Sequence, residues 1–265
     1  IIGPETAYPY PINTDKNDLG STDLPPIFSA ISEQTHAEIL FGGYDHFKDA
    51  PDFSHYMTEY NAAFQLDTQG KLIETYHKKI LIPFGETLPF GPFNKMASKM
   101  IPTMAFFAEG LKFPLFETRK NLSYISTICY ELLRPEFIRD YLNSLDKKPN
   151  FMINLTNDSW YGNTLEPEQH LFLARWRAIE FKLPILRATN TGVSVFLDAH
   201  GQEVERLNYG ISDNLDLKIN IARYLTKDDG DTFFQKWGFF TIFAIWCLCI
   251  IFHLLLIKFK HAKIK

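Results

Sequence analysis

The stretch SYISTICYELLRPEF at residues 123–137 decides the fold. Ser123–Ile128 is a β-prone run that predicts a strand. A helical pattern follows to about Leu145, and it begins at Pro135, since proline is favoured in the first turn of a helix. Cys129 stands at the junction between the two elements.

Strands and helices continue to alternate after this junction. Phe151–Leu155 is predicted to be a short apolar strand, and Glu166–Phe181 a helix. Two further strands are expected at Ile185–Ala188 and Val193–Leu197, followed by a turn at Asp198–Gly201. This alternation favours an α/β domain.

Upstream of the junction the sequence predicts three more strands. Ala37–Gly43 is an apolar run, and Ala62–Leu66 and Leu72–Tyr76 are joined by a turn at Asp67–Gly70. Residues 6–30 are punctuated by proline and glycine and are predicted to form a loop. The chain begins abruptly, at what is predicted to be the end of a strand, and we expect residues to be missing before it.

The composition is that of a folded protein with a large core. The chain has 265 residues, of which 46% are hydrophobic and 22% charged, with a net charge of -4. Basic residues do not cluster along the polar part, so no nucleic-acid partner is expected. Cys129 is the only cysteine in that part, because Cys247 and Cys249 lie in an apolar run near the C-terminus.

That C-terminal run is predicted to cross a membrane. Residues 239–257 carry no formal charge, and a helix of this length spans a hydrocarbon core of roughly 30 Å. We assign residues 237–257 to this helix, with Trp237 at the interface. The lysine-rich tail at 258–265 is expected to be cytoplasmic by the positive-inside rule, which places the preceding domain outside the cytoplasm.

An irregular apolar segment lies between the two halves of the domain. Thr87–Phe116 contains four prolines among many phenylalanine and methionine residues. It is either a flap that covers the core or a lid that contacts lipid. We expect the lid, with Phe106 and Phe107 contributing to substrate binding through an exposed apolar surface.

The residues suited to chemistry are one thiol, several carboxylates and a lysine. A nucleophile at a strand-to-helix turn is exposed at the sheet edge, and a thiol needs a base or a positive charge beside it. His170 reads as a surface or packing residue, and no zinc-ligand spacing or serine-hydrolase motif occurs. Glu5, Lys78 and Glu86 remain as candidate partners of Cys129.

Five blocks of sequence resemble the nitrilase superfamily. They are, in chain order, GPETA at 3–7, YHKKILIPFGE at 76–86, ICYE at 128–131, NLTNDSWYG at 154–162 and RWRAIEFKLPILRATNTG at 175–192. The catalytic trio of that superfamily, Glu, Lys and Cys, occurs here in the same order. Within the superfamily, the IPFGE and NDSWYG blocks and the terminal apolar helix look like the apolipoprotein N-acyltransferases, and the resemblance runs to about Leu217.

This resemblance implies a fold and a set of roles. The fold would be a nitrilase-like α-β-β-α sandwich over residues 1–225, truncated at its N-terminus, followed by the membrane helix. Cys129 would be the nucleophile, Glu5 the general base and Lys78 the group that stabilises the oxyanion and the thiolate. Glu86 and Glu131 would support them, and Trp160 and Tyr161 would form a wall of the acyl pocket.

The resemblance also implies the substrates and the compartment. An acyl chain would pass from a phospholipid to the cysteine, and then to the α-amino group of a diacylglyceryl lipoprotein, without a cofactor or a metal, at the bacterial inner membrane. The membrane bundle and first strand that precede this region in the family are absent, so we expect the chain to be a fragment. A membrane-tethered amidase and an inactive anchored binding module stay open as alternatives.

Overall fold

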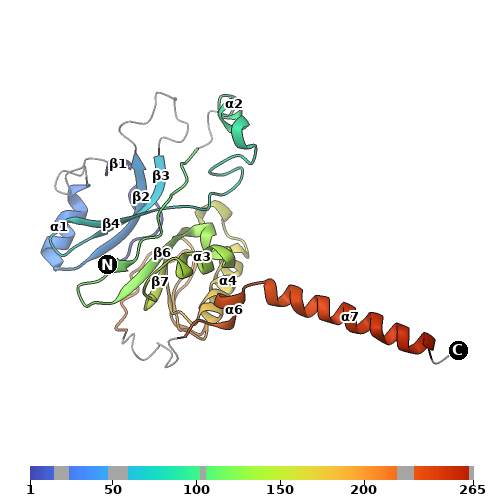
Figure 1. The fold of residues 1–265 in the computed structure, drawn as a ribbon. Helices are drawn as coiled ribbons and strands as arrows, with labels where there is room; N and C mark the ends of the chain where they lie inside the picture. Colours follow the sequence, from blue (N-terminus) through green and yellow to red (C-terminus); the bar gives the residue numbers. More distant parts are fainter. Residues whose placement is uncertain (15–23, 47–58, 102–105, 220–229, 263–265) are drawn as a thin grey trace. The chain divides into compact units, whose positions relative to one another are not determined.

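The computed structural model describes residues 1–14, 24–46, 59–101, 106–219 and 230–262. It divides the chain into two compact units, residues 1–226 and residues 227–265. The elements of the first unit are shown in Figure 1, and they are β1 (Pro11–Ile12), α1 (Pro26–Thr35), β2 (Ile39–His46), β3 (Glu59–Leu66), β4 (Leu72–His77), η1 (Gly91–Phe93), α2 (Asn94–Ser98), β5 (Phe116–Glu117), β6 (Ser123–Ile128), η2 (Cys129–Leu133), α3 (Pro135–Asn143), β7 (Phe151–Asn157), η3 (Asp158–Tyr161), α4 (Glu166–Phe181), β8 (Ile185–Asn190), β9 (Ser194–Leu197) and β10 (Glu203–Leu207).

The first sheet has the order β1-β2-β3-β4. Strand β1 is parallel to β2, whereas β2, β3 and β4 form an antiparallel meander. Its tight turn at Asp67–Gly70 is closed by the Asp67 carboxylate, which accepts hydrogen bonds from the Gln69 and Lys71 amides at 2.8 and 2.9 Å. Helix α1 packs on this sheet, and its Phe28 stacks on Phe41 with 4.0 Å between ring centroids.

The second sheet has the order β10-β9-β8-β7-β6-β5. Its centre is the parallel set β6, β7 and β8, and the flanking strands are antiparallel. All six residues of β6 and the first six of β7 are buried, which is the pattern of strands covered on both faces. Parallel strands end at one edge of a sheet, so the residues that follow β6 and β7 meet there.

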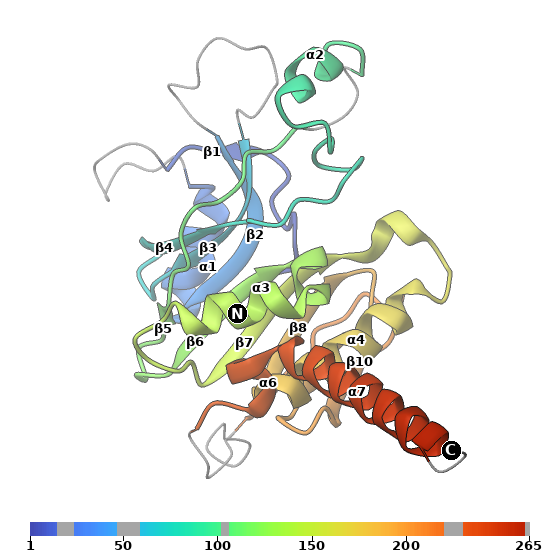
Figure 2. The same cartoon turned by 45° about the vertical axis from the view of Figure 1, so that its right-hand side comes forward.

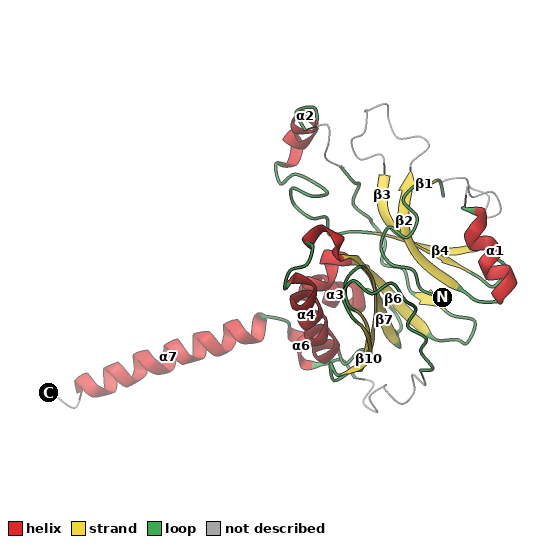
Figure 3. Ribbon diagram, turned by 180° about the vertical axis from the view of Figure 1, so that it is seen from behind, coloured by secondary structure: helices red, strands yellow, loops and turns green. Residues whose placement is uncertain are grey.

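The first unit is layered. Helix α1 lies outside the first sheet, the two sheets face each other, and α3 and α4 lie outside the second sheet (Figures 2 and 3). The predicted α/β class is confirmed, and the strands at β2, β3, β4, β6, β7, β8 and β9 and the helices α3 and α4 lie where the sequence places them.

Several elements were not predicted, among them α1, β10 and the short strands β1 and β5, and one expectation about the lid is wrong. Helix α1 begins at Pro26 within the part of the chain expected to be a loop, and β10 follows the predicted turn at Asp198–Gly201. Phe106 and Phe107 are buried, at 6% and 8% exposure, rather than exposed. Phe107 stacks on Tyr44 with ring centroids 5.4 Å apart, so this part of the segment packs on the domain.

Most of the exposed apolar side chains described in the expected lid lie before those two phenylalanines, and exposed Leu111 lies after them. Phe90, Phe93, Met96, Met100 and Ile101 are exposed, around η1 and α2. Pro102 and Met104, which belong to the same segment, lie outside the described residues.

The second unit consists of α6 (Phe233–Trp237) and α7 (Phe240–Ala262). Across the described residues, no helix combines the length and the apolar character that a membrane crossing requires. The basic tail expected at 258–265 lies beyond the last residue whose side chain is described, Leu255.

Candidate active site

Cys129 lies immediately after β6, in a strained backbone conformation. Its φ of 49° is in the left-handed region, which non-glycine residues avoid and which persists only where the surroundings impose it. The thiol is 5% exposed. The turn is held from within, because the Ile128 amide donates to the Glu131 carboxylate at 2.8 Å.

Glu5 reaches the same edge from the first sheet. Ile2 forms a parallel bridge with Leu40, so the chain runs beside β2 into the GPETA block. The Gly42 amide donates to the Pro4 carbonyl at 3.1 Å, and a Cβ on Gly42 would lie 2.7 Å from the Glu5 Cα. Only glycine allows the two backbones to approach this closely, and the result is a Glu5 side chain that is 6% exposed.

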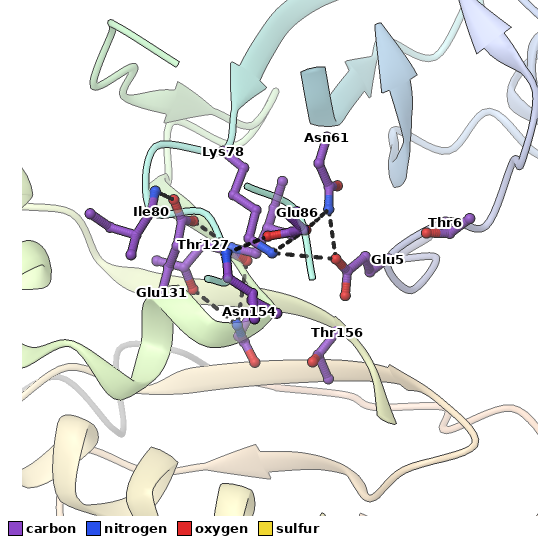
Figure 4. A network of polar contacts seen from close by, with 12 residues as sticks. Glu5, Thr6, Asn61, Lys78, Ile80, Glu86, Thr127, Glu131, Asn154 and Thr156 are labelled. Atoms are coloured by element: carbon purple, nitrogen blue, oxygen red, sulfur yellow. Dashed lines mark hydrogen bonds and ion pairs between the residues drawn. The ribbon is translucent and has the colours of Figure 1, made fainter. Parts of the chain in front are cut away.

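Lys78 follows β4 and connects two carboxylates. Its ammonium is fully buried, with Nζ 2.8 Å from Glu86 Oε1 and 3.7 Å from Glu5 Oε1. Asn61, which the sequence did not single out, donates to Glu5 Oε1 at 2.8 Å and to Glu86 Oε1 at 3.1 Å. Figure 4 shows how these side chains converge from four separate segments, namely Glu5, Asn61, Lys78 and Glu86.

Glu86 also shapes the loop that carries it. Its Oε2 accepts a hydrogen bond from the Ile82 amide at 2.9 Å, and the Glu86 amide donates to the Ile82 carbonyl at 2.8 Å. The IPFGE block is therefore a closed loop whose last side chain points at the Lys78 ammonium.

The Glu131 carboxylate joins two loops. Its Oε1 accepts from the Tyr76 hydroxyl and the Lys79 and Ile80 amides, at 2.7, 2.6 and 3.1 Å. Its other oxygen holds the Ile128 amide. This buried carboxylate thus ties the segment after Lys78 to the turn of Cys129. Burial raises the pKa of Glu131 to about 7, although its hydrogen-bond donors lower it.

The charges and burial around Cys129 do not favour the thiolate that the family resemblance implies. Burial raises the pKa of the Cys129 thiol to about 12, the Glu5 charge adds to this, and the Lys78 ammonium only partly offsets it. Burial also raises the pKa of Glu5, despite the Lys78 charge, and makes it a better proton acceptor. Burial lowers the pKa of the Lys78 ammonium, but the charges of Glu5 and Glu86 raise it by more. The net shift is upward, so Lys78 stays protonated. The resting thiol is therefore protonated beside a base and a fixed cation.

A cysteine, a carboxylate and a lysine in this arrangement are suited to acyl transfer through a thioester. A model of the carbon-nitrogen hydrolase family matches residues 1–223. The chain belongs to the carbon-nitrogen hydrolase family. The resemblance to the nitrilase superfamily is thereby confirmed.

Relatives of this carbon-nitrogen hydrolase include apolipoprotein N-acyltransferases. Those of Bdellovibrio bacteriovorus and Haemophilus influenzae are 32% and 31% identical, over 90% and 96% of this chain and 42% and 46% of their own length. The chain thus spans less than half the length of these relatives. Among solved structures, an amidase from Nesterenkonia sp. AN1 has a TM-score of 0.49 and 18% identity, and covers 77% of this chain and 71% of its own.

The two aromatic residues expected in the acyl pocket lie at the surface of this carbon-nitrogen hydrolase domain. Trp160 is 84% exposed and Tyr161 40%, both on η3 after β7. Burial, and next the charge of Cys129, raise the pKa of the Tyr161 hydroxyl to about 12.

Proposed function

We propose that this domain is an N-acyltransferase that moves an acyl chain from a phospholipid, through a thioester on Cys129, to the α-amino group of a diacylglyceryl-cysteine lipoprotein. The observation that carries this proposal is the buried contact of the Lys78 ammonium with the Glu5 and Glu86 carboxylates, next to a protonated cysteine. The names of the relatives given above support the choice of acyl acceptor.

In the first half-reaction, Glu5 takes the thiol proton as the sulfur attacks the ester carbonyl. The negative charge that develops on the carbonyl oxygen is stabilised by the Lys78 ammonium, which is already in place and needs no reorganisation. The C–O bond then breaks, and the alcohol of the lysophospholipid leaves with the proton held by Glu5. The product is an acyl thioester on Cys129.

In the second half-reaction, the acceptor amine attacks that thioester. An α-amine has a pKa of about 7.7–8.0, so a carboxylate such as Glu5 can accept its proton. The C–N bond forms, the C–S bond breaks, and the thiol is restored with the proton from Glu5. Glu86 holds the Lys78 ammonium through both steps, and Glu131 holds the two loops that carry Lys78 and Cys129.

Lipid substrates require an apolar surface beside the site. We propose that the exposed side chains at η1 and α2, with Trp160, shield the acyl chain from water, at about 0.8 kcal/mol for each methylene. Phe106 and Phe107 are buried and are not part of this exposed surface.

We further propose that residues 237–257 anchor the enzyme in the bacterial inner membrane, with the domain outside and the tail at 258–265 inside. Support comes from the apolar side chains of α7, which are exposed along the helix, among them Phe240, Trp246, Leu248 and Phe252. Alkaline carbonate extraction of membranes tests this proposal, since a spanning helix stays in the pellet. Release of the full chain into the supernatant would contradict it.

The chemistry is tested by mass spectrometry of the full chain after incubation with phospholipid vesicles. We expect an acyl adduct on the peptide that contains Cys129, removed by hydroxylamine and by a diacylglyceryl peptide. Cys129→Ser is expected to abolish the acyl adduct, and an adduct that persists in this variant would contradict the assignment of Cys129. An amidase would instead release ammonia from short amides and pass no acyl group to the peptide.

A further inference from the structure

A buried polar cluster lies behind the nucleophile and takes no part in the mechanism above. Thr156 comes from the end of β7, Asp158 from the start of η3, Arg187 from β8 and His170 from α4. Thr156 and Asp158 are fully buried, and His170 and Arg187 are each 3% exposed. Polar groups are buried at this depth only where they are held by partners.

The cluster is centred on the Asp158 carboxylate. Arg187 Nη2 donates to Asp158 Oδ2 at 2.8 Å, and His170 Nδ1 lies 3.2 Å from Oδ1. Gly192 leaves room for the carboxylate, because a Cβ there would lie 2.1 Å from Asp158 Oδ2. Burial raises the pKa of Asp158, but His170 and Arg187 together lower it below the ordinary value, so Asp158 is ionised.

The composition of the cluster suits a fixed hydrogen-bond network better than a metal ion. Asp158, Glu166 and His170 offer ligand atoms within 4.8 Å of one another. However, the Arg187 guanidinium already pairs with Asp158, and a divalent cation would be repelled by it. Burial and Arg187 lower the pKa of His170, so the imidazole is neutral and its Nδ1–H donates to Asp158.

Thr156 connects this cluster to the nucleophile. Strands β6 and β7 are parallel, and their last pair is Ile128 with Leu155, so the next residues, Cys129 and Thr156, are neighbours. The Thr156 hydroxyl donates to Asp158 Oδ1 at 3.3 Å, and it is close enough to the Cys129 side chain to lower the pKa of that thiol. One hydroxyl hydrogen therefore has two acceptors, the carboxylate and the sulfur.

The sulfur becomes the stronger acceptor only when it is ionised. A thiol is a weak acceptor, whereas a hydrogen bond to a charged group is roughly twice as strong as one between neutral groups. Asp158 keeps its contacts with Arg187 and His170 when the Thr156 hydroxyl turns away. The rotation therefore leaves no buried carboxylate without a partner.

We propose that Thr156 is a catalytic hydrogen-bond donor to the Cys129 sulfur, and that Asp158, fixed by Arg187 and His170, positions its hydroxyl. This inference rests on the proposal that Cys129 is the nucleophile. It adds a donor on the second sheet to the cation that Lys78 supplies on the opposite side of the site.

The test is the alkylation of Cys129 by iodoacetamide in the full chain, followed by quantitative mass spectrometry over a range of pH. Thr156→Val removes the hydroxyl and keeps the shape, and Thr156→Ser keeps the hydroxyl. We expect Val to slow alkylation about tenfold at each pH and Ser to remain within about twofold of the parent. The peptide with Cys247 and Cys249 provides an internal reference.

Each outcome decides a separate point. Equal rates for the parent and Thr156→Val, or equal slowing by Val and Ser, overturn the role of Thr156. If Val does not fold, Thr156→Ala is expected to give the same slowing. A parent Cys129 that iodoacetamide does not modify at any pH overturns the nucleophile itself and thus the proposed function.

The positioning role of Asp158 is tested by a double-mutant cycle. Asp158→Asn should slow alkylation of the parent severalfold and have no further effect in the Thr156→Val background, because residues acting through one another are non-additive. Additive effects would show that Asp158 does not act through Thr156.

Discussion

At the scale of single residues, the Lys78 ammonium is the charge on which two buried carboxylates depend. Lys78→Met removes it and leaves Glu5 and Glu86 buried together without a cation. We expect a loss of about 3–5 kcal/mol in the free energy of unfolding, measured in urea, and no thioester formation.

A compensating change separates the two effects of Lys78. Adding Glu86→Gln to Lys78→Met removes one of the uncompensated charges, so part of the stability should return while thioester formation stays absent. Full stability in the single variant would contradict the buried ion pair.

Glu131 provides a second prediction, because each of its oxygens accepts from a backbone amide. A glutamine would direct its amide group at one of these donors. Glu131→Gln should therefore cost about 2 kcal/mol of unfolding free energy, with slower thioester formation as the two loops loosen. The matched control is Glu136→Gln on α3, where the side chain is exposed and the change should be below about 0.5 kcal/mol. Equal losses of unfolding free energy at the two positions would contradict the role of Glu131 in joining the two loops.

At the scale of elements, the position of Glu5 depends on β2. A Cβ at Gly42 would meet the Pro4 carbonyl and the Glu5 Cα at 2.7 Å, and both are backbone atoms that cannot rotate away. We expect Gly42→Ala to shift Glu5 and to slow thioester formation by about tenfold or more.

The neighbouring glycine is the control for that experiment. At Gly43 the nearest atoms are the Tyr8 carbonyl at 3.2 Å and the Phe64 ring at 3.3 Å, so Gly43→Ala needs only a small adjustment. Comparable losses at both positions would mean that β2 tolerates no side chain there, and that the approach of Glu5 is not the cause.

Periodicity and turn chemistry predicted the elements that have a strong local signal. Strand β6 and helix α4 have the predicted bounds, because a β-prone run defines the strand and a proline in the first turn, Pro167, marks the start of the helix. Helix α1 was missed because its prolines, Pro25 and Pro26, resemble loop punctuation, although proline at a helix start is equally common. Strand β10 has exposed and half-buried positions, so it carries no apolar alternation.

The catalytic candidates were predicted through the family resemblance, whereas their environment was not. The order of Glu5, Lys78 and Cys129 in the chain contains no information on burial, so the protonated thiol was missed. Asn61 and Thr156 lie within ordinary strand patterns, and their partners come from distant segments. The signal that could have found them is polarity within a buried run, since a polar residue there requires a partner.

At the scale of the molecule, the described chain has two units, and the proposed chemistry lies in the first. A chain of residues 1–226 should keep a cooperative thermal transition within a few degrees of the full chain. It should also react with a short, water-soluble ester, while transfer from phospholipid vesicles falls by about tenfold or more, because the proposed anchor is gone. Equal loss on both donors would mean that residues 227–265 belong to the fold of the first unit.

The buried, protonated state of Cys129 also bears on the chemical lifetime of the protein. Peroxide and disulfide oxidants react with thiolates, and the oxidation ladder of cysteine begins there. A thiol whose pKa is raised to about 12 holds almost no thiolate at neutral pH. The folded resting protein should therefore resist sulfenylation at Cys129 longer than the unfolded chain.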